Sequence, residues 1–342
     1  MKKLKLIAIV LCLISVTAYG QDLHFAQYSA SPTTLNPALT GFMNGNFRVA
    51  ANYRNQWFSN ASFATYALST DVNIARKDLD YDMLGVGVSF YHDIEENSGY
   101  QNTNISLSAA YNVMLTKRPM QYIGFGIQPS LMRKQINLMD VIYGTLYETG
   151  TNTDPIGFSE FGSFKFDLNM GISYYGYFNR KHMFATGVTV SHITQPNFAL
   201  LGNDELYRKY AGYVLTELEV GTSGFAWLKP SVYFAKQGPS IEILPSVKAR
   251  FQFYNAYNDV FLSVGAGLRM IGHNESKAVS SDLVSEVQFT IEAYTIGFSY
   301  DVSFSEVKRA TGRNGGPEVT FMMDMAFDKR SREPRYFKMM QF

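Results

Sequence analysis

The chain has 342 residues, enough for one large domain or two of ordinary size. Charged residues make up 17% of it, below the roughly 25% usual in soluble domains, and aromatic residues make up 15%. The formal net charge of +1 gives no electrostatic reason to expect a nucleic-acid partner.

The first 20 residues have the features of a signal peptide. Lysines form a basic start, residues 6–16 are apolar, and a small-residue cleavage site ends at Gly20. The apolar run is too short for a membrane helix. The only cysteine, Cys12, lies inside it, and Leu11 fits a lipidation site poorly, so lipidation is the lesser alternative. We therefore predict cleavage near Gly20 and a mature chain without disulfides.

Residues 21–44 have no clean hydrophobic period, and Pro32, Pro37 and Gly41 indicate turns. The segment is too irregular for a strand and too rich in small and amide residues for contact with lipid. We predict a plug or periplasmic segment, with Asn36-Pro37 as a fixed turn. It is expected to pack in or under the lumen of a β-barrel formed by the rest of the chain. A disordered leader is the alternative.

Residues 45–327 contain fourteen stretches in which apolar and polar residues alternate, with no helical pattern between them. In residues 295–304 every even position is apolar or aromatic, and in 318–327 every odd position is. A period of two marks a strand with one apolar and one polar face. The stretches lie at 47–57, 64–72, 84–90, 105–113, 123–131, 164–174, 184–190, 214–220, 228–234, 241–253, 260–270, 287–291, 295–304 and 318–327.

The connections between these stretches alternate in length. The long ones are 134–162, 195–209, 271–282 and 305–317, and the short ones are 116–119, 179–181 and 221–224. Outer-membrane barrels have long outer loops and short periplasmic turns, so we expect both ends of the mature chain on the periplasmic side. Residues 73–82 are an exception, and the count requires a tight turn at 292–295 without Gly, Asn or Pro.

This pattern predicts an all-β fold, a single antiparallel transmembrane β-barrel of about 14 strands. Unpaired backbone groups are costly in lipid, so only a closed barrel leaves no exposed edge. A pair of secreted β-sandwiches is the alternative, although no linker divides the chain. Because a charge at mid-membrane on the lipid face costs about 2–4 kcal/mol, we expect the charged strand residues to point inward. These residues are Arg48, Arg54, Asp167, Glu217, Lys248, Arg250, Glu286 and Glu292.

Aromatic residues near strand ends and prolines within strands lead to two further predictions. Aromatic residues near strand ends suit girdles at the membrane interfaces, with ordinary packing as the alternative. They are Trp57, Tyr91, Tyr122, Tyr177, Trp227 and Tyr254. Pro129, Pro230 and Pro245 lie within strands, each followed by serine, and each is expected to mark a bulge or a strand end.

Sequence signs of chemistry are few. The five histidines show no ligand spacing, and Asp78, Asp80 and Asp82 lack the glycine that a calcium loop needs, so they suit a solvated turn. Nothing marks a nucleophile with its base. We predict a non-enzymatic protein without metal or cofactor.

Residues 328–342 form a basic and aromatic tail beyond the last strand. It contains five Lys or Arg residues and two acidic residues, which gives a net charge of +3. We predict a periplasmic peptide that docks a partner, and a signal for barrel assembly is the alternative. The candidate docking residues are Arg330, Arg332, Arg335, Tyr336 and Phe337.

A set of short motifs recurs in order along the mature chain. It begins with Gln27-Tyr28, Asn36-Pro37-Ala38 and Gly41, continues with 84–89 leading to Asp93 and with Ala110-Tyr111, and ends at 296–301, which includes Gly297, Tyr300 and Asp301. In this order the motifs resemble the PorP/SprF family of type IX secretion outer-membrane proteins.

The resemblance implies an integral protein of the Gram-negative outer membrane. Such proteins support export or surface attachment of large adhesins, and in some bacteria gliding. The implied partners are outer-membrane lipid, the C-terminal domain of a secreted adhesin and proteins of the secretion machinery. Two alternatives stay open: a channel or hydrophobic-solute transporter with residues 21–44 as its plug, and, less favoured, an outer-membrane hydrolase.

Overall fold

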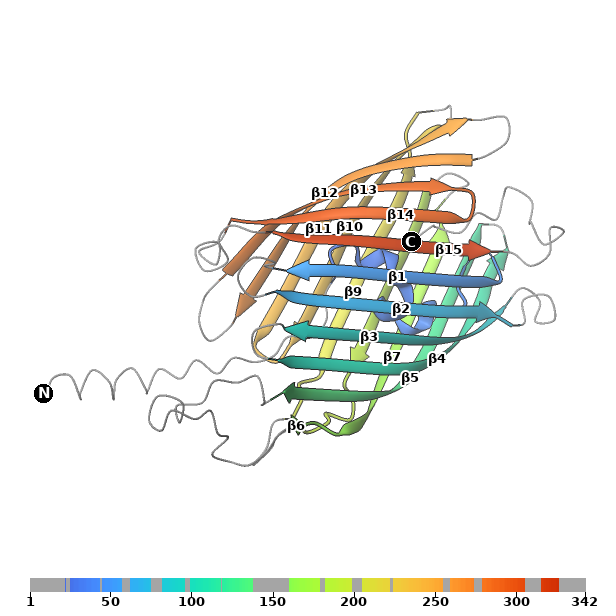
Figure 1. Cartoon of the computed structure of the whole chain (residues 1–342). Coiled ribbons are helices and arrows are strands. Elements are labelled where there is room, and N and C mark those ends of the chain that lie inside the picture. The colour runs from blue at the N-terminus through green and yellow to red at the C-terminus, as the bar shows by residue number, and fades with distance from the viewer. Residues whose placement is uncertain are drawn as a thin grey trace, which may run out of the picture.

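Fourteen long strands form one closed antiparallel barrel in a computed structural model of the chain (Figure 1). The structure describes residues 22, 25–43, 45–56, 62–74, 82–95, 99–117, 119–137, 160–178, 182–198, 205–221, 224–254, 259–273, 279–304 and 315–325. Within them the strands are β1 (Phe47–Gln56), β2 (Phe63–Asn73), β3 (Met83–Glu95), β4 (Tyr100–Lys117), β5 (Met120–Asn137), β7 (Phe164–Tyr177), β8 (His182–Ser191), β9 (Lys209–Glu219), β10 (Ala226–Gln237), β11 (Ser240–Tyr254), β12 (Asp259–His273), β13 (Val279–Ile291), β14 (Tyr294–Ser303) and β15 (Gly316–Met325).

Each long strand pairs with its sequence neighbours, and the pairing of β1 with β15 closes the ring. The two-residue strand β6 (Glu160–Phe161) adds to the end of β5. The predicted barrel of 14 strands is therefore confirmed. The tight turn is also present, because only Glu292 and Ala293 separate β13 from β14, with Glu292 at φ +53°.

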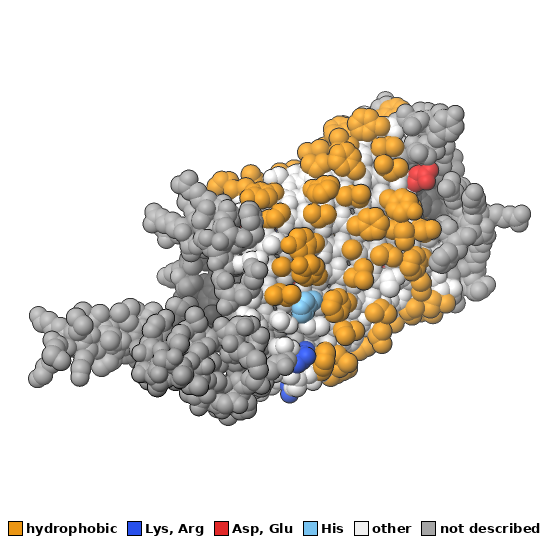
Figure 2. All heavy atoms as spheres, viewed as in Figure 1, with side chains coloured by type: hydrophobic (Ala, Val, Ile, Leu, Met, Phe, Trp, Pro, Cys, Tyr) orange, Lys and Arg blue, Asp and Glu red, His pale blue; other side chains and the backbone are white. Residues whose placement is uncertain are grey.

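The alternation in sequence becomes two faces of the wall. In β14, Ile296 and Phe298 are 43% and 51% exposed on the outside, while Thr295 and Ser299 are buried inside. Figure 2 shows apolar side chains spread over the outer surface of the wall. No helix among the described residues is long and apolar enough to cross a membrane.

Most of the charged strand residues point inward, as expected. Arg48, Arg54, Asp167, Lys248, Arg250 and Glu286 are buried in the barrel, and Glu217 pairs there with Lys229 and Arg250. The prediction is wrong for Glu292, which is exposed. It lies in the turn after β13 and so belongs to neither face of a strand.

An arginine on the lipid face tests this assignment. We expect Val264→Arg, near the middle of β12, to lower the free energy of unfolding by about 2–4 kcal/mol. Ile291→Arg, at the last residue of β13, should cost only about 0–1 kcal/mol because it lies near an interface. Urea unfolding in lipid vesicles measures both, and equal costs would contradict the membrane position of the barrel.

The aromatic girdle is wrong for the four candidates whose side chains the structure describes. Tyr91 lines a cavity in the lumen, Tyr122 is 1% exposed in the lumenal core, and Tyr177 packs against that core. Trp227 contacts the buried ring of Phe261. Position near a strand end suggested lipid contact, but the parity of the alternation places these rings inside. Trp57 and the side chain of Tyr254 lie outside the described part of the chain.

The three prolines also differ from expectation, because the strands continue through them. Between β4 and β5 the pairs Ser106↔Ser130 and Ala109↔Ile127 keep one register across Pro129. The same holds beside Pro230, between β9 and β10, and beside Pro245, between β11 and β12. Proline lacks only the N–H group, so each interrupts the pairing with one neighbour and causes no bulge.

The described part of the N-terminal segment lies inside the barrel, and we call residues 22 and 25–43 the plug. It consists of three short turns, η1 (Tyr28–Ala30), α2 (Pro32–Leu35) and η2 (Pro37–Leu39), which Figure 1 shows in blue inside the ring. Apart from Asp22 and Thr34, every plug residue is buried.

The plug crosses the lumen from one end to the other. Asp22 bonds to Gln237, the last residue of β10, whereas residues 45–46 enter β1 at the opposite end of the barrel. The end of β15 lies beside the start of β1. The prediction that both ends of the mature chain lie on one side is therefore wrong for Asp22, which lies at the end with the long connections. We call this the long-loop end.

Candidate functional site

The centre of the plug is a turn fixed by Asn36. The Asn36 side chain accepts a bond from the Ala38 N–H (2.9 Å), which caps η2. Its Nδ2 donates to the carbonyl oxygens of Ile172 (3.0 Å) in β7 and Val188 (3.3 Å) in β8. Asn36 is completely buried, so its amide replaces water on two wall strands at once.

Inward-facing glycines make room for this turn. A Cβ atom at Gly171 would overlap the Asn36 side chain, and one at Gly187 would lie 2.7 Å from Asn36 Nδ2. A Cβ at Gly126 would overlap the main chain of Pro37 and Ala38. The wall of β5, β7 and β8 is thus shaped to receive the plug backbone at van der Waals distance.

Two more glycine contacts lie toward the ends of the plug. Gly41, at φ +71°, has a conformation that other residues rarely adopt, and its Cα meets Gly85 of β3 so closely that neither position has room for a Cβ. A Cβ at Gly297 in β14 would overlap the Gln27 side chain. The close approach of plug and wall therefore extends along most of the lumen.

The plug end next to β1 is held by a buried ion pair. Arg48 and Asp71 are 2.6 Å apart, and both are almost fully buried. Arg48 also donates to the carbonyl oxygens of Leu39 (2.9 Å) and Phe42 (3.1 Å), while Asp71 accepts from the Gly41 N–H (2.7 Å). Each member of the ion pair thus also forms hydrogen bonds with the plug main chain. A buried ion pair is stable when its remaining hydrogen-bonding groups are satisfied in this way.

Breaking this pair should be costly. We expect Arg48→Met to lower the free energy of unfolding by about 3–5 kcal/mol, since Asp71 would remain buried without its partner. Lys236→Met, which removes an exposed lysine from β10, is the matched control and should change little. Urea unfolding followed by tryptophan fluorescence measures both. Equal stability of the two variants would show that the pair does not hold the plug.

Nearer the long-loop end, Glu318 of β15 holds the plug main chain. Its carboxylate accepts from the N–H groups of Ala26 (2.7 Å) and Gln27 (2.9 Å). The Gln27 side chain in turn accepts from Gln288 (3.0 Å) and Thr320 (3.1 Å). These contacts link the start of the plug to β13 and β15.

An ionic network supports Glu318 from the wall. Asp301 lies 2.5 Å from both Arg54 and Arg269, and Arg54 lies 4.0 Å from Glu318. Arg269 also pairs with Glu242 (3.2 Å). Asp301 therefore positions two arginines behind the carboxylate that binds the plug.

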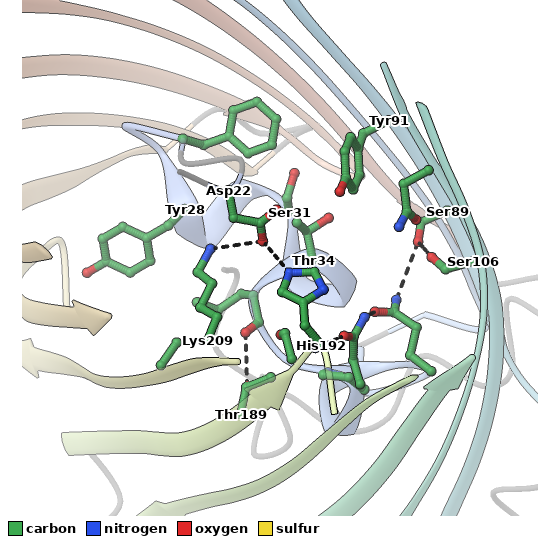
Figure 3. Close-up of a pocket in the computed structure, with 18 of the residues that line it drawn as sticks. Asp22, Tyr28, Ser31, Thr34, Ser89, Tyr91, Ser106, Thr189, His192 and Lys209 are labelled. Atoms are coloured by element: carbon green, nitrogen blue, oxygen red, sulfur yellow. Dashed lines mark hydrogen bonds and ion pairs between the residues drawn. The ribbon is translucent and has the colours of Figure 1, made fainter. Parts of the chain in front are cut away.

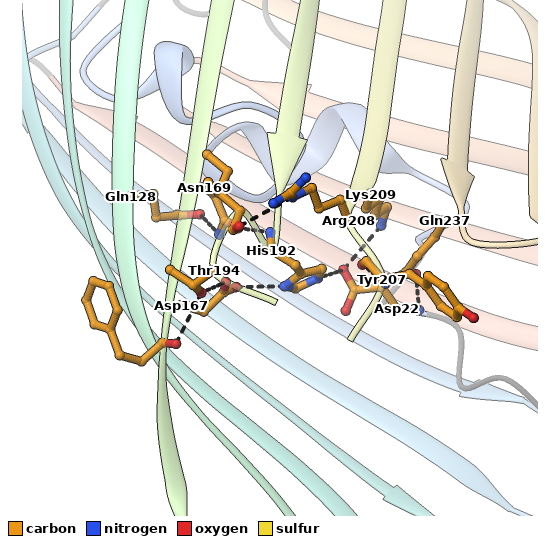
Figure 4. A network of polar contacts seen from close by, with 12 residues as sticks. Asp22, Gln128, Asp167, Asn169, His192, Thr194, Tyr207, Arg208, Lys209 and Gln237 are labelled. Carbon is orange, nitrogen blue, oxygen red and sulfur yellow. Dashed lines mark hydrogen bonds and ion pairs between the residues drawn. The ribbon is translucent and has the colours of Figure 1, made fainter. Parts of the chain in front are cut away.

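Asp22 is held by a group of charged wall residues (Figure 4). Its Oδ2 lies 3.2 Å from His192 Nε2 and 3.4 Å from Lys209 Nζ, and its N–H donates to Gln237 (3.0 Å). His192 Nδ1 lies 2.6 Å from Asp167. We call Asp22, His192, Asp167 and Lys209 the latch. His192 has φ +57°, a strained conformation for a residue other than glycine.

Both ring nitrogens of His192 face carboxylates, so both must donate a hydrogen bond. That requires the imidazolium form. Burial alone would lower the pKa of His192, but Asp22 and Asp167 outweigh it and raise the pKa to about 9. Burial would likewise raise the pKa of Asp22, while Lys209 and His192 lower it below the usual range. His192 and Asp22 are therefore both charged at neutral pH.

A small cavity of about 80 Å³ lies between the plug and the wall (Figure 3). Tyr28, Ser31 and Thr34 border it on the plug side, and hydroxyl and amide groups such as those of Ser89 and Gln128 border it on the wall side. It has room for a few water molecules but not for a passing solute. Among the described residues, no cluster of His, Cys, Asp or Glu could hold a metal ion.

Comparison with known proteins gives one decisive result. Residues 17–317 match the family described as type IX secretion system membrane protein PorP/SprF. The chain belongs to this family. It is thus a membrane component of type IX secretion, and its fold is a closed β-barrel. No curated protein matches the sequence closely enough to add to this result.

Solved structures show a likeness in fold alone. A FadL homologue from Pseudomonas aeruginosa has a TM-score of 0.48 and 10% identity, covering 86% of this chain and 94% of its own. The CymD monoaromatic hydrocarbon channel has a TM-score of 0.45 and 11% identity, with coverage of 87% and 93%. BamA from Haemophilus ducreyi, lacking POTRA domains 1–3, has a TM-score of 0.42 and 12% identity, with coverage of 82% and 70%.

Six of the residues that carried the PorP/SprF resemblance meet where the plug contacts the wall. Gln27, Asn36, Pro37, Gly41 and Gly297 all take part in the contacts described above. Tyr28 joins them by stacking on Tyr233 of β10, with ring centroids 5.2 Å apart. These six motif residues therefore belong to one structural unit, the plug and the wall that binds it.

Other motif residues lie elsewhere. Asp301 belongs to the ionic network behind Glu318, and Asp93 is buried in the wall, where it accepts from Thr65 (2.9 Å) and Asn102 (3.1 Å). Tyr300 is 40% exposed on the outer face. The candidate docking residues Arg330, Arg332, Arg335, Tyr336 and Phe337 lie outside the described residues.

Sequence reasoning did not identify the latch or Glu318 as plug contacts. Asp167 was expected to point inward, but nothing in the sequence linked it to Asp22 through His192. Glu318 is the first residue of the alternating stretch 318–327, in which Val319 and the other odd positions are apolar. The alternation therefore predicts that Glu318 points inward. Its partner, the main chain of Ala26 and Gln27, leaves no sequence signal.

Proposed function

We propose that this protein is a non-enzymatic outer-membrane accessory of the type IX secretion system that supports export or surface anchoring of an adhesin-like cargo. The observation that carries this is family membership joined to a plugged lumen. A barrel filled by its own chain suits binding better than flow. The long connections at one end would hold the cargo's C-terminal domain, and the opposite end would face the secretion machinery.

The latch argues against a hydrolase. His192 is the described residue that most resembles a catalytic base, since Asp167 holds its Nδ1 at 2.6 Å. Its Nε2 faces Asp22 and not a nucleophile, and the imidazolium has no lone pair with which to accept a proton. This arrangement supports a structural role for the histidine.

The basic tail provides the test of partner binding. We expect truncation after Arg330 to leave the amount of barrel and its heat-modifiable mobility unchanged while the amount of cargo on the cell surface falls. Immunoblots of outer-membrane fractions and surface labelling of the cargo measure the two effects. Loss of the barrel itself from the outer membrane would show that the tail is an assembly signal and would contradict docking.

A solute channel gated by the plug is the second candidate. The neutral polar side chains that β3–β5 place on the wall beside the plug favour it. Solute flux into liposomes containing the purified protein distinguishes the two functions. Flux through the unmodified chain would support the channel, and its absence would support the accessory role.

A further inference from the structure

The wall of the lumen binds the plug's main chain at points along most of its length. Six wall side chains bond to N–H or C=O groups between Ala26 and Phe42: Glu318, Gln128, Thr189, Arg48, Asp71 and Asn73. Main-chain groups are the same in every peptide. Recognition of this kind depends on the path of the bound chain more than on its side chains.

The Asn36 side chain adds selectivity. Asn36 fills the niche at Gly171 and Gly187 and bonds to two strands, and Pro37 follows it over Gly126. Because a larger side chain has no room there and an apolar one would lose both bonds to the wall carbonyls, the niche favours an Asn-Pro turn.

The plug is joined covalently to the described barrel at one end only, through residues 45–46. At the other end it is held by His192 and Lys209, which contact Asp22, and by Glu318. It therefore has the geometry of a ligand on a tether. A short flexible tether gives an effective concentration in the millimolar range, which keeps the site occupied while the link is intact.

We propose that the lumen wall is a peptide-binding site, occupied here by the plug, that accepts a second peptide with an Asn-Pro turn once the plug is released. The ligand class is an otherwise irregular peptide with small residues around that turn. This goes beyond the role in secretion and holds whichever cargo the protein serves.

The experiment separates the plug from its tether in the folded protein. A protease site inserted after Asn44 allows the purified, detergent-solubilised barrel to be cut, after which a fluorescent peptide of residues 22–43 is added. We expect saturable binding by fluorescence anisotropy and competition by the unlabelled peptide. A peptide with Asn36→Leu should bind at least tenfold more weakly.

Barrel variants locate the binding in the lumen. Gly126→Val should abolish binding of the labelled peptide, because its side chain would occupy the path of Pro37 and Ala38. Gly272→Val is the matched control and should bind normally, since no atom lies within 4 Å of its Cβ position. If Gly126→Val does not fold, the comparison of the two peptides on the cut wild-type barrel decides the question.

Two results would overturn the proposal. One is the absence of saturable binding to a cut barrel that has lost its resident peptide and keeps its heat-modifiable mobility. The other is equal affinity of the wild-type and Asn36→Leu peptides, which would show that binding does not use the niche.

Discussion

Replacing Gly171 with valine should displace Asn36 from the wall and open the lumen to ions. Even a Cβ at this position would overlap the Asn36 side chain, and the two methyl groups of valine extend further. Asn36 would lose its bonds to Ile172 and Val188, so the middle of the plug could not remain in place. We expect steady conductance in planar lipid bilayers where the wild-type protein shows little.

Gly272→Val is the control for this experiment too, because it adds the same side chain to β12 without meeting any neighbour. It should conduct like the wild type. A folded Gly171→Val barrel with wild-type conductance would mean that the plug tolerates the loss of the Asn36 niche, and the central role given to this turn would be wrong.

The barrel could be predicted from sequence because lipid imposes a strict period of two. Ile296 and Phe298 have to face outward and Thr295 and Ser299 inward, and a shift of one residue would reverse every side chain. The same rule could have corrected the girdle. Tyr122 is adjacent to the outward-facing Ile123, so its parity places it in the lumen although it lies near a strand end.

The plug could be predicted only in outline. The Asn36-Pro37 turn follows from local sequence, but its niche depends on how β7 and β8 lie against a segment without periodicity. The contact between Asp22 and His192 joins residues 170 positions apart, and neither residue is part of a motif. The ionised state of that contact depends on the neighbouring charges, Asp167 and Lys209, which only the folded chain brings to these two residues.

Raising the pH through about 9 should release the Asp22 end of the plug. The pKa of His192 is raised from 6.5 to about 9, so its contribution is complete below about pH 6.5 and is lost as the pH rises through 9. The shift corresponds to about 3 kcal/mol. Above it, the neutral ring has only one N–H, and one of the two carboxylates that face it, Asp22 or Asp167, loses its hydrogen bond.

A spin label detects this release directly. Cys12, the only cysteine, lies in the predicted signal peptide, so Thr34→Cys introduces a single reactive thiol beside the cavity. We expect the label to become mobile with a midpoint near pH 9. In His192→Gln the side chain carries no titratable proton, so the step should vanish and the label should be mobile already at neutral pH. A step of the same size and midpoint in His192→Gln would assign the release to another group. The latch would then hold the plug without sensing pH.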